Sequence, residues 1–160
     1  SHGPWYYQQI ELGFNYRITD LQAALGLSQL GKLDDFIARR RELAARYEQL
    51  LTYLPLTLPS AQPDAESAWH LYVVRLQTER ICLSHRQVFE GLRAAGIGVN
   101  LHYIPVHLQP YYQALGFAEG DFPNAERYYA EAISLPMFPL LTEEQQDYVV
   151  EQLRRLLIEE

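Results

Sequence analysis

The 160-residue sequence has very little lysine and very little cysteine, since Lys32 and Cys82 are the only examples of each. A single cysteine excludes an intrachain disulfide and is compatible with a reducing compartment, so we expect a cytoplasmic protein. No apolar run approaches the ~18 residues of a membrane span and no signal peptide is recognisable, so we expect no membrane partner. The chain starts at Ser1 with residues that have neither helical nor strand periodicity, so we expect it to be part of a longer protein.

Positive charge is also scarce. Lys and Arg together number 13 against 20 Asp and Glu, which gives a formal net charge of −7. Nucleic acids and anionic membranes attract clustered positive charge, so this balance argues against both kinds of partner. The one basic cluster, residues 39–41, lies in a helical pattern beside Asp34, Asp35 and Glu42, which predicts a solvated, salt-bridged helix face.

Motifs for metal or nucleophilic chemistry are absent from the sequence. The five histidines and the cysteine do not recur at the spacings of a zinc site, so we predict no metal site and no catalytic nucleophile. There is no glycine-rich phosphate loop of the G-x-x-x-x-G-K type. His102 and His107 are better placed for function, because they flank Pro105 where an expected strand leaves for a loop.

Helix signals dominate what is present. Three capping boxes, each a Ser or Thr followed three residues later by Gln, begin at Thr19, Ser84 and Thr142. Apolar periodicity predicts a helical segment over residues 19–54 with a break near Gly31. Further helices are expected at 84–96, at 109–117, from 123 and from 142, and strands at 69–76, 97–105 and 134–139. Several helices and few strands indicate an α+β fold, with a small, mainly antiparallel sheet of about three strands covered by helices.

Two loops combine polar and aromatic side chains next to the ends of elements. Residues 13–17 read GFNYR and precede the first helix, although the helix itself does not require them. Residues 100–107 leave the second expected strand. Ligands are often held at such places, but ordinary turn and packing residues give the same pattern, so the pattern alone leaves both interpretations open.

The same two loops carry a family resemblance that covers nearly the whole chain. GFNYRITDLQAALGLSQL, GIGVNLHYIPVHLQPYY, FPNAE and SLPMFP resemble segments of the DegT/DnrJ/StrS family. The family consists of sugar aminotransferases of fold type I that use pyridoxal 5'-phosphate (PLP). The resemblance implies that residues 1–18 are an arm left from a large domain, that 19–54 are the interdomain helical segment, and that 55–160 are the small C-terminal domain.

The resemblance also implies roles for particular residues. In the family, the asparagine of the GFNYR motif reaches across a dimer to the cofactor phosphate, so Asn15 and Arg17 are expected to contact PLP in a homodimer with shared sites, and Asn15 also to lie at the substrate. A second matching stretch contacts substrate in the family; its residues here are Asn100, Leu101, His102, Tyr103, Ile104 and Pro105. The implied partners are a UDP-sugar substrate and an amino donor, glutamate.

The lysine that carries the cofactor in this family has no counterpart in the sequence. Lys32 lies in the helical segment, outside any match to the lysine motif. The resemblance therefore implies the C-terminal part of an aminotransferase, inactive by itself. Two alternatives stay open: a non-catalytic binding or dimerisation module that keeps the family's surface, and a relative that uses the same scaffold and PLP for sugar dehydration.

Overall fold

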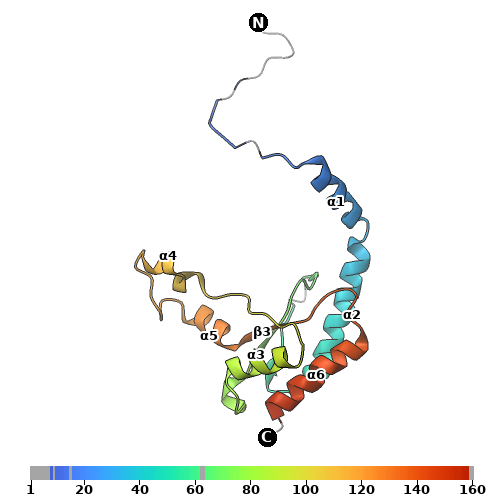
Figure 1. Cartoon of the computed structure of the whole chain (residues 1–160), viewed down its shortest axis with the longest axis vertical. Coiled ribbons are helices and arrows are strands. Elements are labelled where there is room, and N and C mark those ends of the chain that lie inside the picture. The colour runs from blue at the N-terminus through green and yellow to red at the C-terminus, as the bar shows by residue number, and fades with distance from the viewer. Residues whose placement is uncertain (1–7, 9, 15, 62–63, 159–160) are drawn as a thin grey trace. The chain divides into compact units, whose positions relative to one another are not determined.

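The computed structural model describes residues 8, 10–14, 16–61 and 64–158, and the chain divides into two compact units. The first unit is Ser1–Asp34 and the second is Asp35–Glu160. Figure 1 traces the elements of both units in chain order. No helix in the described part of the chain is both long and apolar enough to cross a bilayer.

The first unit contains helix α1 (Asp20–Leu30), which begins at the predicted capping box. The Gln22 N–H donates to Thr19 Oγ1 at 3.3 Å, and the Thr19 N–H donates to Gln22 Oε1 at 3.0 Å. The predicted break near Gly31 is confirmed, because α1 ends there in a turn of Gly31 and Lys32. Helix α1 is rich in apolar residues, yet none of its side chains is buried, so the helix contributes to no hydrophobic core among the described residues.

Helix α2 (Leu33–Leu51) begins at the end of the first unit and supplies part of the core of the second. Its buried residues Leu43, Tyr47 and Leu51 are spaced four apart, which places them on one face of the helix. The chain leaves the helix before Pro55, whose missing N–H cannot continue it.

The sheet consists of three short antiparallel strands in the order β1-β2-β3: β1 (Leu56–Thr57), β2 (Tyr72–Leu76) and β3 (Ala132–Leu135). In the central strand the buried side chains of Tyr72, Val74 and Leu76 alternate with two half-buried ones. This alternation is expected of a strand with one face on the core. The predicted α+β fold with a small antiparallel sheet is confirmed.

The predicted strand at 97–105 is wrong. Only Asn100 pairs there, through two backbone hydrogen bonds of 2.9 and 3.3 Å with Ser134 of β3. The neighbouring backbone groups bond locally, since the Leu101 N–H donates to the side chain of Asn100 and the Val99 N–H donates to the Ile97 carbonyl. Groups used in this way cannot extend a ladder, so the pairing stops at one residue.

β1 is the third strand instead, in a stretch where the sequence pattern predicts none. Its Leu56 is buried and pairs with Leu76, and the Gln77 side chain donates to the Leu56 carbonyl at 3.1 Å. Two residues are too short for a periodicity to indicate a strand, and the pairing depends on a partner 20 positions away, from 56 to 76.

Helices α3 (His85–Ala94) and α6 (Glu143–Ile158) pack against each other over the core. Both begin at predicted capping boxes, at Ser84 and Thr142. Gly91 permits their close approach, because a Cβ there would lie 2.7 Å from Leu156 Cδ2. Two shorter helices, α4 (Pro110–Gln113) and α5 (Pro123–Glu131), start at prolines, and Figure 1 shows them on the other side of the sheet from α2 and α6. Single 3₁₀ turns at Thr78–Arg80 (η1) and Val106–Leu108 (η2) complete the unit.

The basic residues 39–41 are only partly the solvated face that the sequence predicts. Arg39 pairs with Glu42 and Arg41 with Glu66, each at 2.9 Å and on the surface of α2 or beside it. These two pairs confirm the salt-bridged part of the prediction.

Arg40 departs from that prediction. Its Nη1 donates to the carbonyl oxygens of Trp69, His70 and Met137, at 3.0, 3.1 and 2.9 Å. One half-buried guanidinium therefore joins α2 to the segment before β2 and to the segment after β3. The sequence alone gives no sign of this difference, because Arg39, Arg40 and Arg41 are chemically identical.

Replacing Arg40 with methionine should destabilise the protein by about 2–4 kcal/mol, because three carbonyls lose a charged donor at a partly buried place. Arg41→Met is the control, since it removes an exposed ion pair with Glu66, worth about 0–1 kcal/mol, and one exposed hydrogen bond to the Ser67 carbonyl. Urea unfolding of both variants measures the two losses, provided their m-values agree. Equal losses would show that Arg40 acts only as another surface residue of α2.

Candidate functional site

A pocket of about 640 Å³ opens in the second unit, where β3 ends and α6 begins. Its walls come from the turn after α3, the end of β3 with the residues that follow it, and the first turns of α6. Buried Ile97, Met137 and Leu141 give it an apolar part, and polar side chains lie beside them. A mainly apolar hollow of this size with a few polar groups is typical of a small-molecule site.

Two of the predicted substrate residues, Asn100 and His102, line this pocket together with Ser134. Ser134 is only 3% exposed, and its Oγ lies 2.7 Å from Nδ1 of His102. The rings of His102 and Tyr103 meet edge to face, with centroids 4.7 Å apart. The imidazole is thus held by a hydrogen bond on one side and by an aromatic ring on another.

The structure does not bring the remaining predicted residues to this pocket. Tyr103 and Ile104 are exposed, Leu101 is half-buried and Pro105 is buried, and none of the four is among the lining residues that the structure describes. Arg17 is exposed in the first unit. Asn15 lies outside the described residues.

The pocket carries negative charge. Glu144 lines it from the first turn of α6, where its own backbone N–H and the Thr142 hydroxyl hydrogen-bond its carboxylate and lower its pKa. No lysine or arginine occurs among the described residues of its walls. A phosphate would therefore be repelled by Glu144, whereas a neutral polar group would find hydrogen-bonding partners in Asn100 and His102.

Sequence reasoning missed Ser134, Glu144 and Tyr148 as residues of this pocket. Ser134 and His102 are 32 positions apart, and they meet because β3 pairs with Asn100, which no periodicity indicates. One signal was available: AISL places a hydroxyl in an otherwise apolar strand. A buried hydroxyl needs a hydrogen-bond partner, so the position invites the question of what it bonds.

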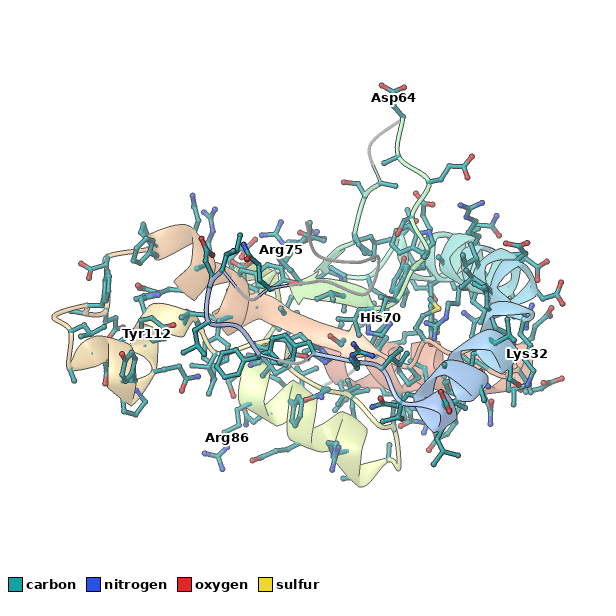
Figure 2. All side chains as sticks on the ribbon, turned by 90° about the horizontal axis from the view of Figure 1, so that it is seen from above. Lys32, Asp64, His70, Arg75, Arg86 and Tyr112 are labelled. Atoms are coloured by element: carbon teal, nitrogen blue, oxygen red, sulfur yellow. The ribbon has the colours of Figure 1, made fainter. Side chains whose placement is uncertain are left out.

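Residues 106–131, which contain η2, α4 and α5, follow the loop that carries His102 and are called the lobe here. Glu126 of α5 closes this lobe. The carboxylate lies 2.7 Å from Nε2 of buried His107 and accepts from the Gly120 N–H at 2.9 and 3.0 Å. Gly120 has φ 96°, in the left-handed region that favours glycine. These contacts tie η2 to α5 across a lobe with several exposed aromatic side chains, among them Tyr112, which Figure 2 labels on α4. The hydrogen bond with His107, with that from Gly120, lowers the pKa of Glu126.

A family model described as the DegT/DnrJ/EryC1/StrS aminotransferase family matches residues 2–154. The chain belongs to this family. The family expectation drawn from the GFNYR and HYIPVHLQPYY stretches is thereby confirmed.

Several members of the family resemble this chain in sequence and in fold. Spore coat polysaccharide biosynthesis protein SpsC of Bacillus subtilis (strain 168) is 40% identical over 160 residues, which cover 98% of this chain and 41% of SpsC. PseC of Helicobacter pylori, an aminotransferase involved in the biosynthesis of pseudoaminic acid, is 27% identical with a TM-score of 0.84, over 98% of this chain and 42% of PseC. Spr1654 of Streptococcus pneumoniae, in its PLP form, is 28% identical with a TM-score of 0.85, over 95% of this chain and 39% of Spr1654. The chain thus spans about two fifths of the length of these relatives.

The family's cofactor is PLP, and Spr1654 has also been solved in its PMP form. The pocket of the second unit does not fit this cofactor by itself: its described walls offer no lysine for covalent attachment and no cation for the phosphate. Lys32 is exposed in the turn between α1 and α2, where Figure 2 labels it. The pocket fits instead a neutral ligand with both apolar and polar groups.

Acidification should show how Glu126 closes the lobe. The Gly120 amide-proton shift should titrate with a midpoint below 4.5, the ordinary pKa of a glutamate, because the folded lobe favours the carboxylate. By linkage, this stabilisation is present at neutral pH and is lost as the pH falls through the lowered pKa.

NMR titration of the chain and of two variants tests this. Glu126→Gln should abolish the titration and speed amide exchange at Gly120, because a neutral amide is a weaker acceptor. The control Glu119→Gln, at an exposed position of the same lobe, should change neither. A Gly120 shift that follows the wild-type curve in the Glu126 variant would contradict the role of the carboxylate.

Proposed function

We propose that the chain is the C-terminal part of a PLP-dependent aminotransferase whose acceptor is a UDP-linked 4-keto-6-deoxy-N-acetylhexosamine. The product is then UDP-4-amino-4,6-dideoxy-N-acetyl-β-L-altrosamine, on a cytoplasmic route to pseudaminic acid or a related surface polysaccharide, and the amino donor is glutamate. The loop HYIPVHLQPYY supports this choice of sugar, because it resembles the loop of the enzyme that makes that product. PseC, an aminotransferase of pseudoaminic acid biosynthesis, and SpsC, a protein of spore coat polysaccharide biosynthesis, support the same class of pathway.

The observation that carries the proposal is the meeting of Asn100 and His102 in a pocket without cations among its described walls. Such a pocket suits the neutral sugar ring of a nucleotide sugar and not its diphosphate. The amide of Asn100 and the imidazole of His102 can bind sugar hydroxyl or acetamido groups, because each offers a donor or an acceptor. The apolar part formed by Ile97, Met137 and Leu141 suits a deoxy methyl group.

In this mechanism the chain's own residues bind and orient the acceptor. Asn100 and His102 fix the sugar ring so that its keto carbon faces the reacting centre, which lowers the entropic part of the barrier. Glu144 keeps the diphosphate out of the pocket and thereby sets the direction in which the substrate lies. PLP, when bound by the complete protein, supplies the electron sink for amino transfer.

Asn15 and Arg17 are proposed to contact the cofactor phosphate of the other subunit in a homodimer. Their place in the GFNYR motif is the support, since amide and guanidinium donors suit a phosphate dianion. We propose that the chain by itself is inactive, because the family resemblance assigns the lysine and most of the cofactor pocket to a preceding large domain, and the chain spans about two fifths of these relatives.

Kinetics of the full-length enzyme test the assignment of the sugar side. His102→Ala should lower kcat/KM for the nucleotide sugar about tenfold or more, because a hydrogen bond to the acceptor is lost. Tyr103→Ala should lower it in the same direction, because the ring that packs against His102 is lost. The half-reaction with glutamate, measured alone, should keep its rate. His70→Ala is the matched control, since His70 is an exposed histidine outside the pocket walls.

Other outcomes of these assays decide between the open alternatives. A slower glutamate half-reaction with an unchanged sugar half-reaction would place His102 at the cofactor instead. Loss of water from the sugar without amination would favour the dehydratase, and sugar binding without either reaction would favour the binding module.

Subunit complementation tests the shared site. One full-length variant lacks the cofactor lysine and the other carries Asn15→Ala, and each homodimer should be impaired. Refolding an equal mixture should recover roughly a quarter of the wild-type activity, because half of the dimers are mixed and each has one intact site. Losing a charge-assisted hydrogen bond of about 1.5–3 kcal/mol weakens cofactor binding some ten- to a hundredfold, so PLP must be limiting. Recovery no greater than the sum of the parents, in dimers shown to have exchanged, would mean that Asn15 acts within its own subunit.

A further inference from the structure

We propose that Ser134 is the positioning residue of His102: its hydroxyl holds Nδ1 of the imidazole, so that Nε2 is presented to the acceptor in the pocket. The proposal rests on the proposed function for the identity of that acceptor. The link between Ser134 and His102 rests on geometry alone and is testable without it.

The backbone of Ser134 cannot easily move. Both of its backbone groups bond to Asn100: its N–H donates to the Asn100 carbonyl at 2.9 Å, and its carbonyl accepts from the Asn100 N–H at 3.3 Å. On its other side Ser134 lies opposite Val73 in the antiparallel register of β2 and β3. The hydroxyl therefore starts from a fixed point, between the central strand and the loop that carries His102.

The side chain of Ser134 makes a hydrogen bond that the strand itself does not require. Its neighbours Ile133 and Leu135 alternate with it and belong to the core, where they lie opposite Val74 and Tyr72. Ser134 is directed to the other face and is itself buried, at 3% exposed. A buried hydroxyl costs free energy unless it is hydrogen-bonded, and its bond here is the one of 2.7 Å to His102.

That bond determines what the imidazole can do. A neutral histidine has one ring nitrogen that donates and one that accepts, and the Ser134 hydroxyl can bond to Nδ1 in either role, so this bond fixes the direction of the ring. Ser134 occupies Nδ1, and Tyr103 packs edge-on against the ring at 4.7 Å, so two contacts fix its orientation. Because His102 lines the pocket, Nε2 is the ring nitrogen available to a ligand there.

The matched pair of variants is Ser134→Thr and Ser134→Val. Threonine keeps the hydroxyl and valine replaces it by a methyl group of the same shape, so both suffer the same crowding by one added carbon. Both are β-branched and suit a strand. A difference between the two therefore reports the hydroxyl and not packing.

The first measurement is nitrogen NMR of the His102 ring in the 160-residue chain, at a pH where the ring is neutral. Wild type and Ser134→Thr should show the same Nδ1 shift, that of a hydrogen-bonded nitrogen, and Ser134→Val should show a changed Nδ1 shift. Identical His102 spectra in the threonine and valine variants would overturn the proposal, whatever the enzyme does.

The second measurement is the sugar half-reaction of the full-length enzyme. Ser134→Val should lower its kcat/KM about three- to tenfold relative to Ser134→Thr, the effect of one neutral hydrogen bond, and the glutamate half-reaction should be equal in both. Equal sugar kinetics despite different His102 spectra would overturn the positioning role. If the wild-type enzyme aminates no sugar at all, the proposed function fails, and the NMR comparison alone then decides whether Ser134 orients His102.

Discussion

The hydrogen bonds from Arg40 to three backbone carbonyls constrain how the helix, the sheet and the pocket of the second unit fit together. They connect α2 to Trp69 and His70, which lead into the central strand, and to Met137, which follows β3. Met137 is also part of the pocket wall. The helix that covers the core and the segment that shapes the candidate site are therefore fixed by the same guanidinium. Two other side chains of α2 support the same connection, since Tyr47 Oη donates to the Pro136 carbonyl and Arg39 to the Leu141 carbonyl.

The fold could be predicted wherever the signal is local. The capping boxes at Thr19, Ser84 and Thr142 each place both partners within one helical turn, and all three helices begin as expected. The absence of a strand at 97–105 could not be predicted from local signals, because a strand forms only by pairing with another strand. The backbone groups next to Asn100 make local hydrogen bonds instead. The same reasoning explains Arg40, because its three carbonyl partners lie 29, 30 and 97 positions away in the sequence.

The residues of the candidate site also differ in whether the sequence could predict them. Asn100 and His102 were accessible from the sequence through the family resemblance, and the pocket brings them together. Ser134 was not accessible, since its contact with His102 requires the pairing of β3 with a loop 32 positions earlier. A resemblance transfers the residues that touch a ligand, because these lie in motifs. The residues that orient them are found by following each hydrogen bond one step further into the fold.

Electrostatics then limit what the second unit can bind. The chain is acidic overall, and arginines near the core are already engaged: Arg40 by carbonyls, and Arg46 by Asp147 at 2.8 Å. Glu144 is ionised at neutral pH, as an ordinary glutamate is, and it lines a pocket with no cation in its described walls. An anion placed there would meet the negative charge of Glu144 and no cation among the described walls. In the proposed enzyme, the phosphates of the cofactor and of the nucleotide therefore require donors from outside this pocket. Under this proposal the second unit recognises the sugar ring, and selectivity comes from hydrogen bonds held in fixed directions rather than from charge.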